Sequence, residues 1–197
     1  MSTPPSASGA SARPSSFEPA LILATERLVL RPFTVADAEA VFEAVDDEVR
    51  RWMVWAPGYT REQARSYCAL QAHPYPDRGL VRAISAGGRL AGSIGLDGAD
   101  WAAGRVEIGY WLAPWARGRG YAAEATVALT EYAFGRGMSR VQLVAAVGNT
   151  ASQRTAERAG FVREGVLRSY QPIPSGRTDM VMYSRLAESA ESVEPAR

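Results

Sequence analysis

A short glycine-rich turn between a predicted strand and a predicted helix holds the residues best suited to chemistry: Arg117, Gly118, Arg119 and Gly120. The first amides of a helix have no partner within the helix and carry a partial positive charge, so they attract anions. Glycines at 118 and 120 let a phosphate approach the backbone, because no Cβ blocks it. Each charge-assisted hydrogen bond contributes about 1.5–3 kcal/mol, so a few amides can hold a pyrophosphate. We therefore expect a diphosphate site here, with both arginines adding positive charge at its rim.

Two regular patterns flank this turn. Apolar residues alternate with others from Val106 to Leu112, which predicts a strand that ends before Pro114. Small and apolar residues recur at helical spacing from Tyr121 onward, and glycines at 135 and 137 predict the end of that helix. A strand, a glycine-rich turn and a helix N-terminus in this order form an anion-binding unit.

Two other phosphate-binding motifs fit this turn less well. A Walker A loop ends in Gly-Lys-Ser/Thr, and the sequence contains no lysine. A dinucleotide fingerprint requires Gly-x-Gly-x-x-Gly, and its third glycine is replaced by Ala123, which only the looser form allows. That fingerprint also requires an acidic residue at the end of the following strand, where Ala145, Ala146 and Val147 stand.

The run Arg117-x-x-Gly120-x-Ala122 resembles the Q/R-x-x-G-x-G/A motif of the GNAT acyl-CoA N-acyltransferases. The preceding EIGYWL, from Glu107 to Leu112, is similar to the branch that contains the ribosomal-protein-alanine N-acetyltransferases (RimJ/RimL type). The resemblance implies an α+β GNAT fold, in which a mixed, mostly antiparallel sheet has a central parallel pair splayed around acyl-CoA and helices on both faces. It also implies acetyl-CoA, or another acyl-CoA such as succinyl-CoA, as co-substrate. The acceptor would be a primary amine, either a protein N-terminus or a small molecule, that attacks directly in a ternary complex.

The same resemblance implies which residues bind the cofactor. Backbone groups along the strand would bind the pantetheine amides, because a bulge or splay near Gly109 would free the strand edge for the ligand. These strand residues are Tyr110, Trp111 and Leu112. The residues of the turn and of the first helical turn would bind the pyrophosphate, namely Arg117, Gly118, Arg119, Gly120, Tyr121, Ala122 and Ala123.

A second motif runs from Gly148 to Phe161 and contains Asn149, Ser152 and Ala156 on one face of a predicted helix. Asn149 suits a helix N-cap. The family resemblance also implies that this helix face looks at the pantetheine arm of the cofactor, with Asn149 and Ser152 among the residues that bind it. Many family members place a tyrosine, the general acid for the departing thiolate, where Ala156 stands. RimL-like enzymes offer a serine at the place of Ser152, which is our candidate acid, although a plain surface serine is the alternative.

The nucleophile sets a stricter requirement than the leaving group. A thiolate with a pKa of about 8.5 departs with little help. Deprotonating an α-amine at pH 7 costs roughly 1 kcal/mol, and deprotonating a lysine amine costs roughly 4.6 kcal/mol. Glu107, on the central strand, is our candidate base, with Asp97 in reserve. The alternatives are that Glu107 pairs with Arg105 or another arginine, and that Asp97 is an ordinary turn residue.

The family resemblance implies that the acceptor pocket is walled by the segment that joins the first two helices. Trp52, Trp55 and Tyr59 could line an apolar slot there, with Asp97 close by, and residues 171–178 would close the other side. Charges in this region are mixed, so the sequence does not select one amine. A non-catalytic acyl-CoA-binding sensor is the competing class of function; Ala156 favours it, whereas Glu107 and Ser152 together favour an enzyme.

Composition excludes several other functions. The chain has 197 residues, 47% of them hydrophobic and 22% charged, with a net charge of +1 and no basic stripe, so we expect no nucleic-acid partner. Its one cysteine, Cys68, and one histidine, His73, predict neither a disulfide nor a metal site. The cysteine lies far from the motif, which favours direct transfer over an acyl-enzyme. No apolar run is long enough for a membrane span, so we expect a cytoplasmic protein. We also consider a homodimer as its assembly.

Three segments are expected along the chain. Residues 1–20 are rich in Ser, Pro and Ala and lack the apolar run of a secretory signal, which predicts a disordered tail. Residues 21–186 would form the acyltransferase domain, and residues 187–197 a flexible tail. Within the domain, capping boxes predict helices from Thr34 and Thr60, and Gly87-Gly88 predicts a hairpin turn. Further strands are expected at 27–31, 80–85, 90–96, 141–147, 162–169 and 180–185, and a helix at 150–159.

Overall fold

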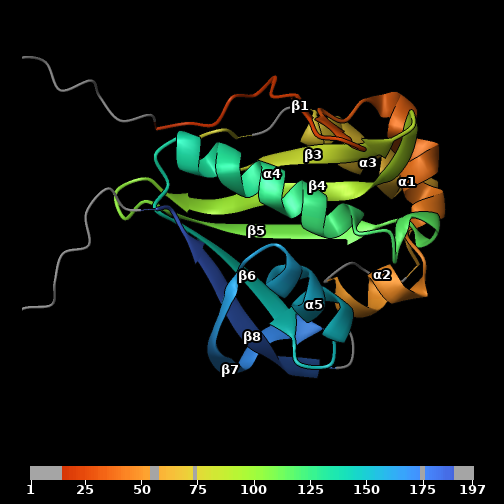
Figure 1. Ribbon diagram of the computed structural model, residues 1–197. Coiled ribbons are helices and arrows are strands. Elements are labelled where there is room, and N and C mark those ends of the chain that lie inside the picture. Colours follow the sequence, from red (N-terminus) through yellow and green to blue (C-terminus); the bar gives the residue numbers. More distant parts are fainter. Residues whose placement is uncertain (1–14, 54–57, 73–74, 174–175, 189–197) are drawn as a thin grey trace, which may run out of the picture.

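The computed structural model describes residues 15–53, 58–72, 75–173 and 176–188, and these form a mixed sheet with helices on both faces (Figure 1). Its eight strands are β1 (Leu23–Ala24), β2 (Val29–Arg31), β3 (Leu80–Ala86), β4 (Arg89–Asp100), β5 (Arg105–Leu112), β6 (Arg140–Ala146), β7 (Val162–Ile173) and β8 (Gly176–Leu186). The strand order is β1-β2-β3-β4-β5-β6-β8-β7, and β5–β6 is the parallel pair within it. The expected α+β fold is confirmed.

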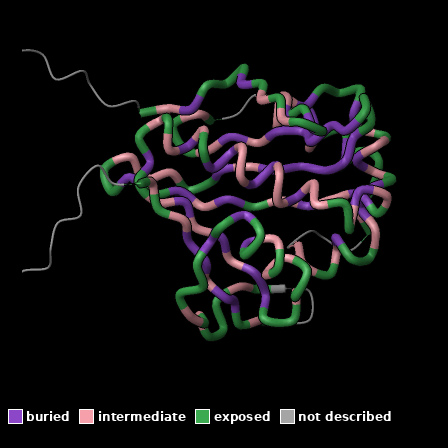
Figure 2. Tube along the Cα trace, viewed as in Figure 1, coloured by how far each residue is buried: buried purple, intermediate pink, exposed green. Residues whose placement is uncertain are grey.

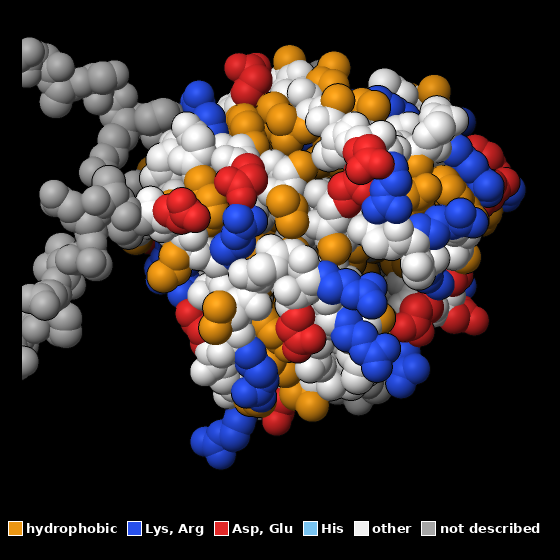
Figure 3. All heavy atoms as spheres, in the orientation of Figure 1, with side chains coloured by type: hydrophobic (Ala, Val, Ile, Leu, Met, Phe, Trp, Pro, Cys, Tyr) orange, Lys and Arg blue, Asp and Glu red, His pale blue; other side chains and the backbone are white. Residues whose placement is uncertain are grey.

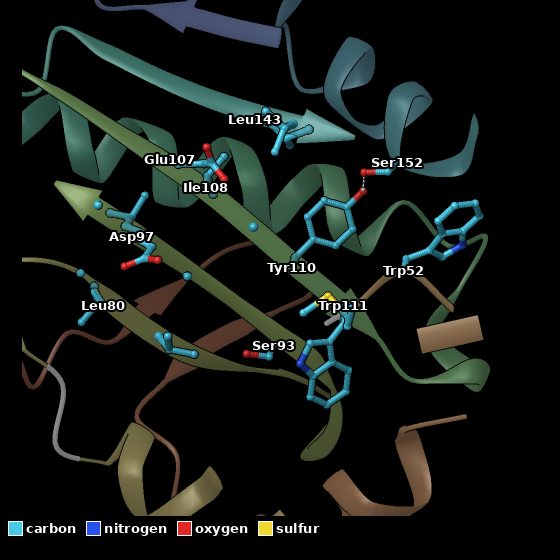
Figure 4. A pocket seen from close by; sticks show the side chains of 18 of the residues that line it. Trp52, Leu80, Ser93, Asp97, Glu107, Ile108, Tyr110, Trp111, Leu143 and Ser152 are labelled. Atoms are coloured by element: carbon cyan, nitrogen blue, oxygen red, sulfur yellow. Dashed lines mark hydrogen bonds between the residues drawn. The ribbon is translucent and has the colours of Figure 1, made fainter. Parts of the chain in front are cut away.

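The parallel pair separates along its length. β5 and β6 are paired at Arg105–Glu107 with Arg140–Gln142. Beyond these residues β5 remains paired with β4, without a register shift up to Leu112, while β6 remains paired with β8 up to Ala146. The expected opening is therefore present, and it arises because two strands diverge rather than from a bulge at Gly109. Figure 4 shows the two strands apart, with Ile108 on β5 and Leu143 on β6.

Helices cover the two faces of the sheet and enclose separate apolar cores. These helices are α1 (Ala38–Ala44), α2 (Asp47–Trp52), α3 (Arg61–Gln71), α4 (Tyr121–Gly135) and α5 (Thr150–Arg158). α4 and α5 pack on one face, over a core that contains Ile108, Leu129 and Leu143. α1 and α3 pack on the other, over a core that contains Val41 and Cys68. The buried stretches follow the strands between these helices (Figure 2). The two cores thus hold β5 in place from both faces of the sheet.

Local signals place several element boundaries. Both predicted capping boxes form, at Thr34 with Asp37 and at Thr60 with Gln63. Glycines 87 and 88 have φ angles of 57° and 79° in the β3–β4 turn, as a type I′ hairpin requires. Helix α2 is an element that the sequence analysis did not predict. The Asp46 side chain caps it by accepting a hydrogen bond of 3.0 Å from the Val49 amide.

The segment before β1 is packed, contrary to the prediction of a loose tail through residue 20. Phe17 is 1% exposed, and its ring lies 4.8 Å from that of Trp101. The buried guanidinium of Arg82 donates hydrogen bonds to the carbonyls of Leu21, Glu18 and Pro19. An aromatic anchor and a buried arginine thus hold this segment to the sheet. The remainder of the two predicted tails, residues 1–14 and 189–197, lies outside the described residues.

Candidate active site

Two adjoining cavities, of about 830 and 340 Å³, open at the gap between β5 and β6. The smaller cavity extends to the glycine-rich turn and the start of α4, and the larger one runs along β4, β5 and β6. Six residues line both cavities: Trp52, Met53, Tyr110, Trp111, Asn149 and Ser152. Two ligands that entered from opposite sides would meet at these residues, which we call the junction (Figure 4).

The N-terminus of α4 faces the smaller cavity without a capping side chain. Its N-cap is Gly120, with a φ of 80°, and Gly118 has a φ of 73°. A Cβ at Gly118 would meet open space, so a ligand can approach the backbone there. Ala122 and Ala123 also line this cavity. The geometry supplies the exposed amides and close backbone approach that a diphosphate requires.

Arg117 does not stand free at the rim. Its guanidinium binds both carboxylate oxygens of Asp46, at 2.7 and 2.8 Å, and also donates to the Leu112 carbonyl. The ion pair lowers the pKa of Asp46 and raises that of Arg117. Arg117 therefore ties the start of α2 to the end of β5, and Asp46 offsets its charge.

Arg119 and Tyr121, also expected to bind the pyrophosphate, contact Trp115 and do not line the smaller cavity. The Arg119 Nε donates to the Trp115 carbonyl at 2.9 Å, and the Tyr121 ring packs edge-on against Trp115. Positive charge in the smaller cavity comes also from Arg154 and Arg158 of α5, which the sequence analysis did not single out. Basic side chains gather over α5 on this face (Figure 3). The sequence signal that could have identified them was their i, i+4 spacing, which places both arginines on one face of the predicted helix.

Backbone direction along β5 decides which groups face the gap. The Ala113 amide donates to the Ala91 carbonyl at 2.8 Å, and directly opposite residues alternate between bonded and non-bonded pairs in an antiparallel ladder. The backbone groups of Trp111 consequently point toward β4, whereas those of Tyr110 and Leu112 point toward the gap. Since Arg117 occupies the Leu112 carbonyl, Tyr110 offers both backbone groups and Leu112 its amide.

Glu107 lies in the larger cavity, at the last paired position of β5 and β6. Burial raises its pKa, and the nearby charge of Asp97 raises it further, while a 3.2 Å hydrogen bond from Gln142 opposes the shift. Arg105 pairs instead with Asp100 at 3.3 Å, so the alternative in which Arg105 neutralises Glu107 is wrong. A carboxylate with a raised pKa is a stronger proton acceptor once it is ionised.

The start of α5 contributes the polar groups of the junction. The Asn149 side chain caps the helix by accepting a hydrogen bond of 3.0 Å from the Ser152 amide, as its predicted N-cap role requires. The Ser152 hydroxyl faces both cavities and accepts a hydrogen bond of 3.2 Å from the Tyr110 hydroxyl. Ala156 is fully buried and lines neither cavity, whereas Thr155 lines the smaller one.

The expected acceptor wall is formed only in part by the residues named for it. Trp52 lines both cavities, and its ring lies so close to Gly148 that a Cβ there would be 3.3 Å away. Asp97 lines the larger cavity. Tyr59 lines neither cavity; it packs beside the α1–α3 core, where burial raises its pKa to about 12. Trp55 lies outside the described residues.

Within the described ranges, no group of three or more His, Cys, Asp or Glu side chains is arranged to hold a metal ion. None of the helices in that same part of the chain is long and apolar enough to cross a bilayer. Cys68 is buried in α3, and burial raises its pKa to about 11, so its thiol is a poor nucleophile.

A splayed parallel pair beside an open helix N-terminus, with a carboxylate in the adjoining cavity, suits the transfer of an acyl group from an acyl-CoA to an amine. Residues 27–162 match the family model described as the acetyltransferase (GNAT) domain. The chain therefore belongs to the GNAT acetyltransferase family, which confirms the resemblance inferred from Arg117, Gly120 and Ala122.

Named relatives agree with this assignment. The chain is 37% identical over 156 residues to the uncharacterized N-acetyltransferase YoaA of Bacillus subtilis, covering 76% of this chain and 87% of YoaA. It is 33% identical over 85 residues to the ribosomal-protein-serine acetyltransferase of Escherichia coli, covering 43% and 48% of the two chains. The crystal structure of the microcin C7 self-immunity acetyltransferase MccE in complex with acetyl-CoA and AMP superposes with a TM-score of 0.76, covering 83% of this chain and 94% of that one. At 24% identity, this last likeness shows a shared fold.

Proposed function

We propose that this enzyme transfers the acetyl group of acetyl-CoA to the α-amine of a protein N-terminus by direct attack in a ternary complex. The observation that carries the proposal is the division of the site at the junction. Glu107 lines only the larger cavity, whereas Ser152 lines both. This arrangement supports direct transfer, because the base lies on the acceptor side and a hydrogen-bond donor lies where the two ligands meet.

The residues act on the two reactants as follows. The amides at the start of α4 bind the diphosphate, and the edge of β5 holds the pantetheine arm. Glu107 accepts the proton that the amine loses as its nitrogen forms the N–C bond. Ser152 donates a hydrogen bond to the sulfur, which leaves with the electron pair of the broken C–S bond and then takes a proton from solvent. Each residue thus acts on charge that develops during the transfer.

Two features favour an α-amine as acceptor. Deprotonating it at pH 7 costs roughly 1 kcal/mol, so a usable share of the amine is already neutral, whereas deprotonating a lysine amine costs roughly 4.6 kcal/mol. The larger cavity, at about 830 Å³, can also admit the first residues of a peptide. The name of the E. coli relative, a ribosomal-protein-serine acetyltransferase, is consistent with a protein acceptor.

The test combines calorimetry with thiol release. We expect the purified chain to bind CoA and to release free thiol from acetyl-CoA when a peptide with a free N-terminus is present. The same peptide with a blocked N-terminus and one lysine should give little release. Turnover on small amines alone would reject the protein acceptor, and CoA binding without turnover on any amine would support the non-catalytic sensor. Faster turnover with succinyl-CoA would reassign the donor; Arg78, which lines the larger cavity, could pair with its carboxylate.

A further inference from the structure

The hydrogen bond between Tyr110 and Ser152 joins the two sides of the splayed sheet. Tyr110 belongs to β5 and Ser152 to α5, 42 positions apart, and their hydroxyl oxygens lie 3.2 Å from each other. Both residues line both cavities, so the bond lies at the junction (Figure 4). The sequence analysis gave Tyr110 a backbone role only. Its side chain reaches the donor that we assign to the leaving group.

The direction of this bond determines what Ser152 can do. A serine hydroxyl has one proton to donate, together with lone pairs that accept. Because the Tyr110 hydroxyl donates to the Ser152 oxygen, the Ser152 hydroxyl keeps its own proton for another acceptor, and Ser152 lines both cavities at the junction. Burial raises the pKa of Tyr110, so its phenol keeps its proton at neutral pH and remains a donor.

The backbone of Ser152 is fixed as well. Its amide donates to the Asn149 side chain at 3.0 Å, and this cap holds the first turn of α5. The helix residue where other family members place a tyrosine is Ala156, which is fully buried and lines neither cavity. In the part of the chain that the structure describes, the tyrosine at the junction is therefore Tyr110 of strand β5 and not a residue of helix α5.

We infer that Tyr110 is a positioning residue that orients the Ser152 hydroxyl toward the thioester sulfur. The inference rests on the proposed function. No proton leaves Tyr110: the C–S electron pair departs with the sulfur, the Ser152 proton hydrogen-bonds to the developing thiolate, and the amine proton goes to Glu107. Tyr110 acts by removing the other orientations of the Ser152 hydroxyl.

The test is a double-mutant cycle on steady-state kinetics. Tyr110→Phe deletes only the hydroxyl and should lower kcat about tenfold, leaving the KM for acetyl-CoA and the calorimetric Kd of CoA within about twofold. Ser152→Ala should lower kcat by a similar factor, and adding Tyr110→Phe to it should cause no further loss. The matched control is Tyr183→Phe: the Tyr183 hydroxyl also bonds α5, at Glu157 with 3.3 Å, yet Tyr183 lines neither cavity. We expect this control to retain wild-type kcat.

Each of the other outcomes would overturn either the role of Tyr110 or the proposed function. Full kcat in Tyr110→Phe, or an equal further loss when Tyr110→Phe is added to Ser152→Ala, overturns the inference while leaving the proposed function intact. A weakened Kd for CoA with unchanged kcat would show that Tyr110 shapes the cofactor cavity only, and would also overturn it. If the wild-type chain itself releases no thiol, the proposed function fails, and the role of Tyr110 fails with it.

Discussion

Asp97 and Glu107 occupy directly opposite positions on β4 and β5, so two carboxylates share one end of the larger cavity. The negative charge of Asp97 adds to burial in raising the pKa of Glu107. The pair also attracts a positively charged amine before that amine loses its proton. Asp97 was proposed from the sequence as a reserve base, and its position predicts a second role, which is to raise the pKa of the base beside it.

The pH dependence of the reaction tests this role of Asp97. Glu107 works as a base only when ionised, so kcat/KM should fall as the pH drops through its raised pKa. Asp97→Asn removes the neighbouring charge and lowers the pKa of Glu107. The fall of kcat/KM on the acidic side, the acidic limb of the pH profile, should therefore move to lower pH. The limb that belongs to the acceptor α-amine, near its pKa of about 7.8, should stay in place and serves as an internal reference.

A charge control separates this effect from a general change in the field of the protein. Asp100 lies on the same strand, pairs with Arg105 at 3.3 Å, and does not line the larger cavity. Asp100→Asn should therefore leave the acidic limb where it is. If Asp97→Asn shifts the limb upward or leaves it unmoved, the proposed coupling of the two carboxylates is wrong.

Glu107, the proposed base, should contribute more to the rate of transfer than Ser152, the proposed hydrogen-bond donor. Glu107→Gln keeps the size of the side chain and its contact with Gln142 but cannot accept a proton, so kcat/KM at pH 7 should fall by about 10²–10⁴. Ser152→Ala should cost only about tenfold, because a thiolate with a pKa of about 8.5 is already a good leaving group. Both variants should bind CoA with the wild-type Kd. Equal losses in the two variants would contradict this division of roles.

Local sequence signals predicted much of the fold. The capping boxes at Thr34 and Thr60, the Gly87-Gly88 turn and the glycine-rich turn each act within a few residues, so short-range chemistry fixes them. α2 also carried such a signal and was missed: Asp46 as N-cap, acidic residues in its first turn and arginines in its last.

Contacts between distant segments could not be predicted in this way. The bond of Tyr110 to Ser152, the ion pair of Arg117 with Asp46 and the burial of Phe17 all join positions far apart in the chain. Composition predicted a disordered tail around Phe17, because one aromatic residue changes the average composition of a Ser/Pro-rich stretch only a little. Its burial depends on a complementary site on the sheet.

The glycine at the start of α4 offers a direct test of the diphosphate site. Gly120→Ala places a methyl group beside the amides that would bind the diphosphate, at a φ of 80° that disfavours alanine. We expect the Kd of CoA to rise at least about tenfold. The matched control is Gly137→Ala, because Gly137 has a φ of 92°, open space around it, and lies past the other end of α4. The control should lose a comparable stability yet bind CoA normally; equal loss of binding in both would assign the effect to strain alone.

The aromatic anchor before β1 should stabilise the whole domain. Phe17 is 1% exposed and packs against Trp101 and Tyr132, so Phe17→Ala leaves a cavity and should lower the free energy of unfolding by about 3–5 kcal/mol. Ile22, in the same segment, is 62% exposed, and Ile22→Ala should change that free energy by less than about 0.5 kcal/mol. Urea denaturation followed by tryptophan fluorescence gives both values, because Trp101 reports on the anchor directly. A Phe17→Ala protein as stable as Ile22→Ala would mean that this segment detaches without consequence, and that the domain begins after it, as the sequence had suggested.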